Sequence, residues 1–468
     1  MTNRAISALA TLFVALFVLL AARQAYVMVI KGPDIAAKPY NPRHALLDSL
    51  RGRILATDGT VLAKTVGKQR VYPYGQSLAQ TLGYVSERYG TSGIEDGYDR
   101  ALTPPDTTGD PAAQFDQLLA SIQGKASQAH GADVVTTIEP AIQSEAWQEL
   151  SQHERGAVVV LDPRSGAVLA LASVPSFDPN ALDRSFASLN ADPGSPLLNR
   201  AIDGLYPPGS TFKIFTAASA LDAGTVGMDS HFDDPGYYAI GDFTLHYNEG
   251  EATGYQDLTT AFALSSNVDF AQIALKMGTD LFYQYLEKWG IGSSLDFQLP
   301  AETDRVPDKA SVVPGELAQM GFGQGALLMT PLQMALVAAT IANGGNMPRP
   351  YLVRQIVRDG TAASVTPNGN LASPVSADTA ANVKKMMVAV VSRGTGTVAQ
   401  LPNVQVAGKT GTATNPHGAA HSWFVCFAPA DRPRVAVAVI VENGGYGADV
   451  AAPIARNVLR EALTVVKD

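Results

Sequence analysis

A serine and a lysine three positions apart, Ser210 and Lys213, are the residues of this 468-residue chain best suited to covalent chemistry. They follow a Pro-Pro-Gly turn at residues 207–209 and precede an apolar stretch at 214–222 that contains no Gly or Pro. The pattern predicts a turn that leads into a buried helix, with both side chains on one helix face. A serine hydroxyl becomes an effective nucleophile when a base takes its proton. Burial and a nearby cation would lower the pKa of the lysine far enough for it to be that base.

Taken alone, this spacing also describes an ordinary helix N-terminus with a lysine in its first turn. Two later segments make a catalytic interpretation more specific: the Ser-Ser-Asn run at residues 265–267 and the Lys-Thr-Gly-Thr run at 409–412. The first interrupts a helical pattern, so Asn267 could cap the next helix, present its amide over the nucleophile, or do both. The second lies in a strand pattern, where Lys409 could be an ordinary exposed lysine. Gly411 argues against that, because a glycine in a strand lets a ligand backbone approach the strand edge.

These three motifs, in this order, resemble the signature of penicillin-binding proteins and serine β-lactamases. The middle motif of this chain, Ser-Ser-Asn at residues 265–267, has the Ser-x-Asn form of high-mass penicillin-binding proteins. An Arg-Gly-Arg-Ile run at residues 51–54 and a Gly-Ile-Glu run at 93–95 resemble the class B penicillin-binding proteins, and the short non-catalytic segment resembles the penicillin-binding protein A type of actinobacteria. The resemblance implies a peptidoglycan D,D-transpeptidase that cross-links stem peptides ending in D-Ala-D-Ala through an acylated serine, and that β-lactams inhibit covalently.

The resemblance also implies a catalytic role for five side chains. Ser210 would attack the carbonyl of the penultimate D-alanine after giving its proton to Lys213. Ser265 would relay a proton toward the leaving amine, and Asn267 would hold the substrate amide. Lys409 would supply the positive potential that lowers the pKa of Lys213.

Substrate binding is implied for the rest of the third motif. Thr410, Gly411 and Thr412 would bind the terminal carboxylate of the stem peptide. The backbone N–H groups of Ser210 and Thr412 would form the oxyanion hole, where each donor contributes roughly 3 kcal/mol or more to the stability of the transition state. This chemistry requires no metal and no cofactor.

Other interpretations share the same motifs. A serine β-lactamase needs a residue that activates water, and no glutamate can be assigned to that task from the sequence. A D,D-carboxypeptidase would pass the acyl group to water instead of an amine. A catalytically idle division scaffold, or a β-lactam sensor, would keep the fold without the reaction. The rate at which a bound penicillin is released would separate the transpeptidase from the β-lactamase.

Composition excludes some function classes. The chain has 34 Lys and Arg against 43 Asp and Glu, a formal net charge of -9, and no basic run or basic-aromatic patch, so nucleic-acid binding is not expected. Its one cysteine, Cys426, excludes an intrachain disulfide. His417 and His421 are four positions apart, but no third ligand accompanies them, so no metal site is predicted.

An uncharged apolar run at residues 5–22 predicts a membrane anchor. As a helix it would be about 27 Å long, close to the roughly 30 Å hydrocarbon core of a bilayer. We expect a short cytoplasmic tail at residues 1–4, a single-pass anchor in the cell membrane at 5–24, and the remaining chain outside the cytoplasm. A glycosyltransferase of the cell-wall machinery is an expected partner.

The remaining patterns predict an α/β (α+β) chain of two further domains. A small pedestal is expected at residues 32–150 and a penicillin-binding/β-lactamase-like transpeptidase domain at 151–468. In the second, strand patterns at both ends enclose a helical middle, which predicts one five-stranded antiparallel sheet flanked by helices. The expected strands are at residues 156–161, 167–172, 404–414, 421–427 and 434–441, with a final helix at 450–466.

Overall fold

A five-stranded antiparallel sheet forms the centre of the C-terminal part of the chain, as predicted. The structure is a computed structural model that describes residues 2–26, 51–104, 130–240, 243–246, 252–416 and 418–467. The strand order is β17-β18-β19-β7-β8, so the two early strands join the three late ones through the pairing of β7 with β19. The strands are β7 (Gly156–Leu161), β8 (Val168–Val174), β17 (Ala407–Ala413), β18 (His421–Ala428) and β19 (Val435–Val441).

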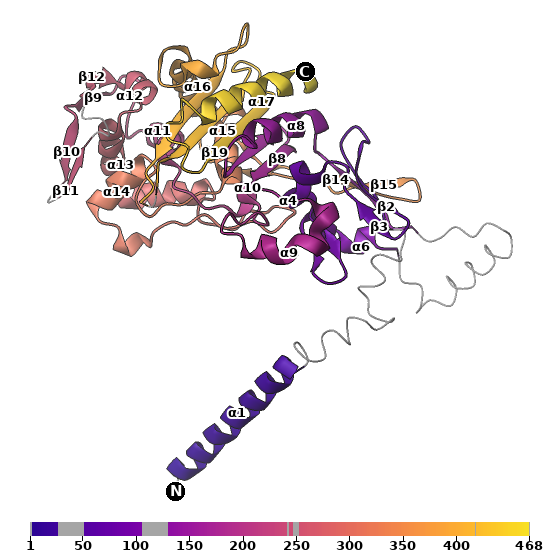
Figure 1. Ribbon diagram of the computed structural model, residues 1–468. Helices are drawn as coiled ribbons and strands as arrows, with labels where there is room; N and C mark the ends of the chain where they lie inside the picture. Colours follow the sequence, from indigo (N-terminus) through magenta and orange to yellow (C-terminus); the bar gives the residue numbers. More distant parts are fainter. Residues whose placement is uncertain are drawn as a thin grey trace.

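Both faces of this sheet are covered by helices, because side chains along each strand alternate between two cores. In β7, Val158 and Val160 face a core shared with α8 (Pro140–Leu150) and α17 (Ala451–Val465). Ala157 and Val159 face the opposite core, shared with the largely apolar, buried helix α15 (Pro331–Ala342). Figure 1 shows α8 and α17 side by side over the sheet.

The helices in the middle of the chain surround a buried helix, α11 (Lys213–Asp222). A short 3-10 turn, η4 (Gly209–Phe212), comes directly before it. Ser210 therefore lies in the 3-10 turn and Lys213 begins the α-helix. The Phe215 ring packs against Phe212, Phe282 and Trp289, with ring centroids 4.6 to 5.8 Å apart. The neighbouring helices are α12 (Leu258–Leu264), α13 (Asn267–Lys288), α14 (Pro314–Gly321) and α16 (Ala377–Arg393).

A small insert of two hairpin-like sheets separates α11 from α12. It consists of β9 (His231–Asp234), β10 (Tyr237–Ile240), β11 (Phe243–His246) and β12 (Gly254–Asp257), with β9 paired to β12 and β10 paired to β11. Figure 1 shows it at the edge of the molecule next to α12 and α13. No sequence pattern predicted this insert.

A second, six-stranded sheet has the order β15-β14-β6-β1-β2-β3. Strands β1 and β2 pair around the Asp-Gly turn at residues 58–59, and the sheet also takes a hairpin from late in the chain, β14 and β15, which sequence order did not indicate. Its strands are β1 (Ile54–Leu55), β2 (Val61–Val66), β3 (Gln69–Val71), β6 (Asp133–Thr136), β14 (Val353–Arg358) and β15 (Thr361–Ser364).

Buried charges join the second sheet to the short helix α5 (Gly93–Gly97), which carries Glu95. The fully buried Glu95 carboxylate accepts from Arg51 Nε at 2.6 Å and from Arg70 Nε at 2.7 Å. Both guanidinium groups are almost completely buried, so the three side chains form one ionic cluster. Two parts of the predicted pedestal, residues 32–50 and 105–129, lie outside the described residues, and the domain boundaries stay predictions.

The N-terminal segment forms helix α1 (Thr2–Ala25), and large apolar side chains along it, such as Phe13 and Leu19, are exposed. Among the helices of the described residues, none combines the length and the apolarity that crossing a bilayer requires. The predicted anchor at residues 5–24 is therefore not shown by the structure.

Candidate active site

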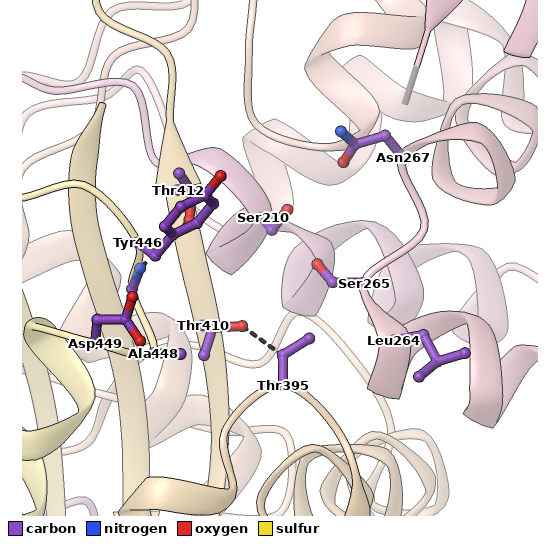
Figure 2. A pocket seen from close by; sticks show the side chains of 11 residues that line it. Ser210, Leu264, Ser265, Asn267, Thr395, Thr410, Thr412, Tyr446, Ala448 and Asp449 are labelled. Atoms are coloured by element: carbon purple, nitrogen blue, oxygen red, sulfur yellow. Dashed lines mark hydrogen bonds between the residues drawn. The ribbon is translucent and has the colours of Figure 1, made fainter. Parts of the chain in front are cut away.

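Ser210 lies at the junction of two cavities of about 300 and 520 Å³. Figure 2 shows its hydroxyl between Ser265 and Asn267 on one side and the strand that carries Thr412 on the other. The smaller cavity is lined by Ser210, Leu264, Ser265, Asn267, Thr395, Thr410, Thr412, Tyr446, Gly447, Ala448 and Asp449. The nucleophile predicted from the sequence thus faces solvent in a cleft between the sheet edge and the helical region.

The turn that carries Ser210 is held by backbone contacts on both sides. Gly209 N donates to Gly323 O at 2.9 Å, and Trp423 Nε1 donates to Pro207 O at 3.0 Å. Gly323 has φ +80°, and a Cβ there would lie 2.0 Å from the Gly209 oxygen. The glycine-rich loop at residues 321–325 therefore sets the position of Ser210. Sequence analysis did not assign this role to the loop.

Lys213 lies fully buried behind the cleft. Its Nζ is 2.6 Å from Ser265 O, 2.7 Å from Asn267 Oδ1 and 3.2 Å from Ser265 Oγ. Burial lowers the pKa of Lys213 well below its usual value, and the positive charge of Lys409 lowers it further. Both effects favour the neutral form of the amine, which is the form that a base requires. Among the described residues, no hydrogen bond joins it to the Ser210 hydroxyl.

Lys409 is the second fully buried amine. Its Nζ donates to Ser265 Oγ at 2.7 Å and to Thr410 O at 3.1 Å. Burial lowers the pKa of Lys409 to about 7. One hydroxyl, that of Ser265, thus lies between two amines. Its oxygen accepts hydrogen bonds from Lys213 Nζ and Lys409 Nζ, and its own proton can be donated to either amine when that amine is neutral.

The Ser-Ser-Asn loop has a conformation that directs these groups inward. Ser265 ends α12 in the left-handed region with φ +66°, which is uncommon for a residue other than glycine. Ser266 caps α13, because its hydroxyl accepts from Asp269 N at 3.0 Å. The possibility that Asn267 is the cap is therefore wrong. The Asn267 amide oxygen is instead engaged by Lys213.

The third motif lies on β17, which is an edge strand of the sheet. Thr410 Oγ1 is 2.6 Å from Thr395 Oγ1, and Thr412 Oγ1 accepts from Gly447 N at 3.3 Å. Gly411 has a role in packing that differs from the predicted approach of a ligand: a Cβ there would lie 2.9 Å from Thr211 Cγ2. The edge leaves backbone groups of alternate residues unpaired, which fits the predicted oxyanion hole without testing it.

The structure thus brings Ser210, Lys213, Ser265, Asn267 and Lys409 together, although they come from three distant segments. Sequence analysis missed one wall of the cleft, residues 446–449 and Thr395. A Gly-Gly-Tyr-Gly run at 444–447, directly after a predicted strand, was the available signal for that wall. The described residues contain no group of three or more His, Cys, Asp or Glu placed to hold a metal ion.

Two families of known sequences match the chain. Residues 156–460 match the penicillin binding protein transpeptidase domain, and residues 51–134 match the penicillin binding protein A dimerisation domain. Peptidoglycan D,D-transpeptidase PbpA of Mycobacterium tuberculosis (strain H37Rv) is 36% identical, over 98% of this chain and 99% of that protein. Peptidoglycan D,D-transpeptidase MrdA of Escherichia coli (strain K12) is 31% identical, over 81% of this chain and 69% of that protein.

Solved structures of penicillin-binding proteins and transpeptidase domains are also similar to this chain. Penicillin-binding protein A from M. tuberculosis, as its ceftriaxone acyl-enzyme complex, has a TM-score of 0.80 and 34% identity, and the match covers 89% of this chain and 99% of the other. The D,D-transpeptidase domain of a peptidoglycan glycosyltransferase from Eggerthella lenta also has a TM-score of 0.80, with 36% identity over 89% of this chain and 99% of the other. The chain therefore belongs to the penicillin-binding protein transpeptidase family.

Proposed function

We propose that this chain is a peptidoglycan D,D-transpeptidase that cross-links stem peptides through an acyl-enzyme on Ser210 and is acylated at the same residue by β-lactams. The observation that carries the proposal is the shared Ser265 hydroxyl, which lies 2.7 Å from one buried amine and 3.2 Å from another beside an accessible serine. Relatives named as D,D-transpeptidases and a neighbour solved as a β-lactam acyl-enzyme support it.

Acylation begins when neutral Lys213 takes the proton of Ser210. The Ser210 oxygen attacks the carbonyl carbon of the penultimate D-alanine, and the negative charge on the carbonyl oxygen is stabilised by the backbone N–H groups of Ser210 and Thr412. The C–N bond to the terminal D-alanine then breaks. The leaving nitrogen takes a proton through Ser265, which returns Lys213 to its neutral form.

Deacylation uses the same groups in reverse. An amine of a neighbouring stem peptide attacks the ester carbonyl, loses a proton to Lys213 and expels the Ser210 oxygen, which is reprotonated. The product is a new peptide bond between two stems, and the enzyme is unchanged.

Recognition of the donor stem is assigned to the cleft walls. The hydroxyls of Thr410 and Thr412 on β17 hydrogen-bond the terminal carboxylate beside the backbone of Gly411, and the Asn267 amide contacts the stem backbone. Charged Lys409, buried directly behind Thr410, attracts the carboxylate electrostatically.

The proposal is tested by labelling with a fluorescent penicillin. The wild type and Ser188→Ala, which removes an exposed serine hydroxyl on another helix, are expected to become labelled, and Ser210→Ala is not. Equal labelling of Ser210→Ala would overturn the nucleophile assignment. A synthetic D-Ala-D-Ala stem incubated with and without an acceptor amine then separates the reactions: amine-dependent product supports a transpeptidase, and hydrolysis alone indicates a carboxypeptidase. Rapid release of the label indicates a β-lactamase.

We also propose that residues 5–24 anchor the protein in the cell membrane as a single pass, with the catalytic part outside the cytoplasm and a cell-wall glycosyltransferase as a partner. The uncharged run at residues 5–22 and the exposed apolar side chains of α1 support the anchor, and the class B resemblance supports the partner. Membranes from expressing cells are washed with alkaline carbonate. The full chain should stay in the pellet, and a chain without residues 1–26 should not. Release of both would contradict the anchor.

A further inference from the structure

A buried carboxylate supports the Ser-Ser-Asn loop from behind. Asp234, at the end of β9, is fully buried. Its Oδ2 accepts from Ser266 Oγ at 2.7 Å and from Thr253 Oγ1 at 2.8 Å, and its Oδ1 accepts from Gly236 N at 2.8 Å. The insert between α11 and α12 therefore contacts the middle residue of the second motif directly.

Strand β12 of the insert completes a ring of hydrogen bonds around Ser266. Gln256 on β12 donates through Nε2 to Thr253 Oγ1 and to Asp269 Oδ2, both at 2.6 Å. The backbone N–H of Asp269 donates to Ser266 Oγ at 3.0 Å, and Ser266 donates to Asp234. The Ser266 hydroxyl thus both donates and accepts, which fixes its orientation.

We propose that Asp234 is a positioning residue for the acyl transfer: through Ser266 it holds the loop in the conformation that presents Ser265 Oγ and Asn267 to Lys213. The proposal rests on the function proposed above. The left-handed Ser265 is unfavourable for a non-glycine residue, so the loop needs contacts that fix it. The bond from Ser266 to Asp234 is made by the residue that directly follows Ser265.

Asp234 also acts on Lys213 through its charge. The charged groups that face Lys213 are Lys409 on β17, Asp269 on α13 and Asp234 on β9. Lys409 lowers the pKa of Lys213, and the two carboxylates raise it. Removing the charge of Asp234 therefore lowers the pKa of Lys213, so the neutral base persists to a lower pH.

The test compares Asp234→Asn with Asp233→Asn, which removes the same charge from the exposed face of the same strand. The acylation rate constant with a fluorescent penicillin is measured against pH, and active sites are counted by the final extent of labelling. For Asp234→Asn we expect acylation about 10- to 100-fold slower at neutral pH, a full count of active sites, and an acidic limb displaced to lower pH. Asp233→Asn is expected to match the wild type.

A rate and a pH profile of Asp234→Asn equal to those of Asp233→Asn would overturn the inference. So would a loss explained entirely by fewer labelled sites, because that result indicates only destabilisation. If Asp234→Asn does not fold, Ser266→Ala carries the test, since it keeps the charge and removes the link. Slower acylation with an unmoved acidic limb then supports the inference, and a wild-type rate refutes it. An unlabelled wild type would instead refute the proposed function.

Discussion

Removal of the Ser265 hydroxyl gives the sharpest test of how the two buried amines share one proton. In Ser265→Ala, Lys409 keeps only its bond to Thr410 O at 3.1 Å in a fully buried site. A hydrogen bond to a charged group contributes about 1.5–3 kcal/mol. Since each 1.4 kcal/mol is a factor of ten, the protonation equilibrium of Lys409 should move about 10- to 150-fold toward the neutral amine.

Ser265→Ala should change both the acylation rate constant and its dependence on pH. Loss of the proton relay slows acylation by about 10²- to 10⁴-fold. In addition, the active state needs Lys213 neutral and Lys409 charged. Because the pKa of Lys409 is already about 7 in the wild type, lowering it further moves the alkaline limb of the rate profile to lower pH. Ser265→Ala should therefore lose the most activity above neutral pH.

Stopped-flow acylation by a fluorescent penicillin, measured from about pH 5 to pH 9, gives both the rate loss and the position of the alkaline limb. Ser188→Ala is the matched control, because it removes a serine hydroxyl on α9 (Leu182–Ala191) that bonds only within its own helix. A Ser265→Ala rate within about threefold of the wild type, with an unmoved alkaline limb, would refute the shared-proton mechanism.

Other substitutions test the base, the pedestal and the nucleophile turn. Lys213→Arg should abolish acylation, detected by mass spectrometry, because guanidinium cannot act as a base. Glu95→Gln should lower the free energy of unfolding in urea by about 3–5 kcal/mol, because it removes the carboxylate paired with buried Arg70 and leaves Arg51 only its pair with Asp99. An unchanged midpoint would contradict that. Gly323→Ala should slow acylation at least about 10-fold by displacing the turn. Gly344→Ala, also at positive φ but in open space, should keep the wild-type rate.

The motifs and the central sheet could be predicted because their signals are local. Within a helix, a Ser-x-x-Lys spacing places the two side chains on one face. The continuous apolar runs of β18 and β19 are typical of strands buried on both faces, as they are here. Their place in one sheet with β7 could be expected because strands at both ends of the domain enclose a helical middle that must pack on a common sheet.

The contacts that support the site could not be predicted, because the residues that make them are far apart in the sequence. Strand β14 pairs with β6 more than two hundred residues earlier, and nothing in either strand specifies the other. Asp234 stands in a His-Phe-Asp-Asp run that is typical of a surface turn, and it becomes buried only because Ser266 meets it. Ser266 and Asn267 are both good helix caps, so the sequence could not decide between them.

Two buried amines around one hydroxyl also give the carboxylates of Asp234 and Asp269 an electrostatic role at this site. Lysine ammonium groups that share a dry site cannot both stay charged near neutral pH. The pKa of Lys213 lies well below its usual value and that of Lys409 near 7, while the carboxylates of Asp234 and Asp269 oppose the loss of the last proton. Both shifts favour loss of charge from the amines, and that of Lys213 is opposed by the two carboxylates. Acyl transfer benefits from amines whose charged and neutral forms are close in free energy, because a proton taken from Ser210 must next be delivered to the leaving amine.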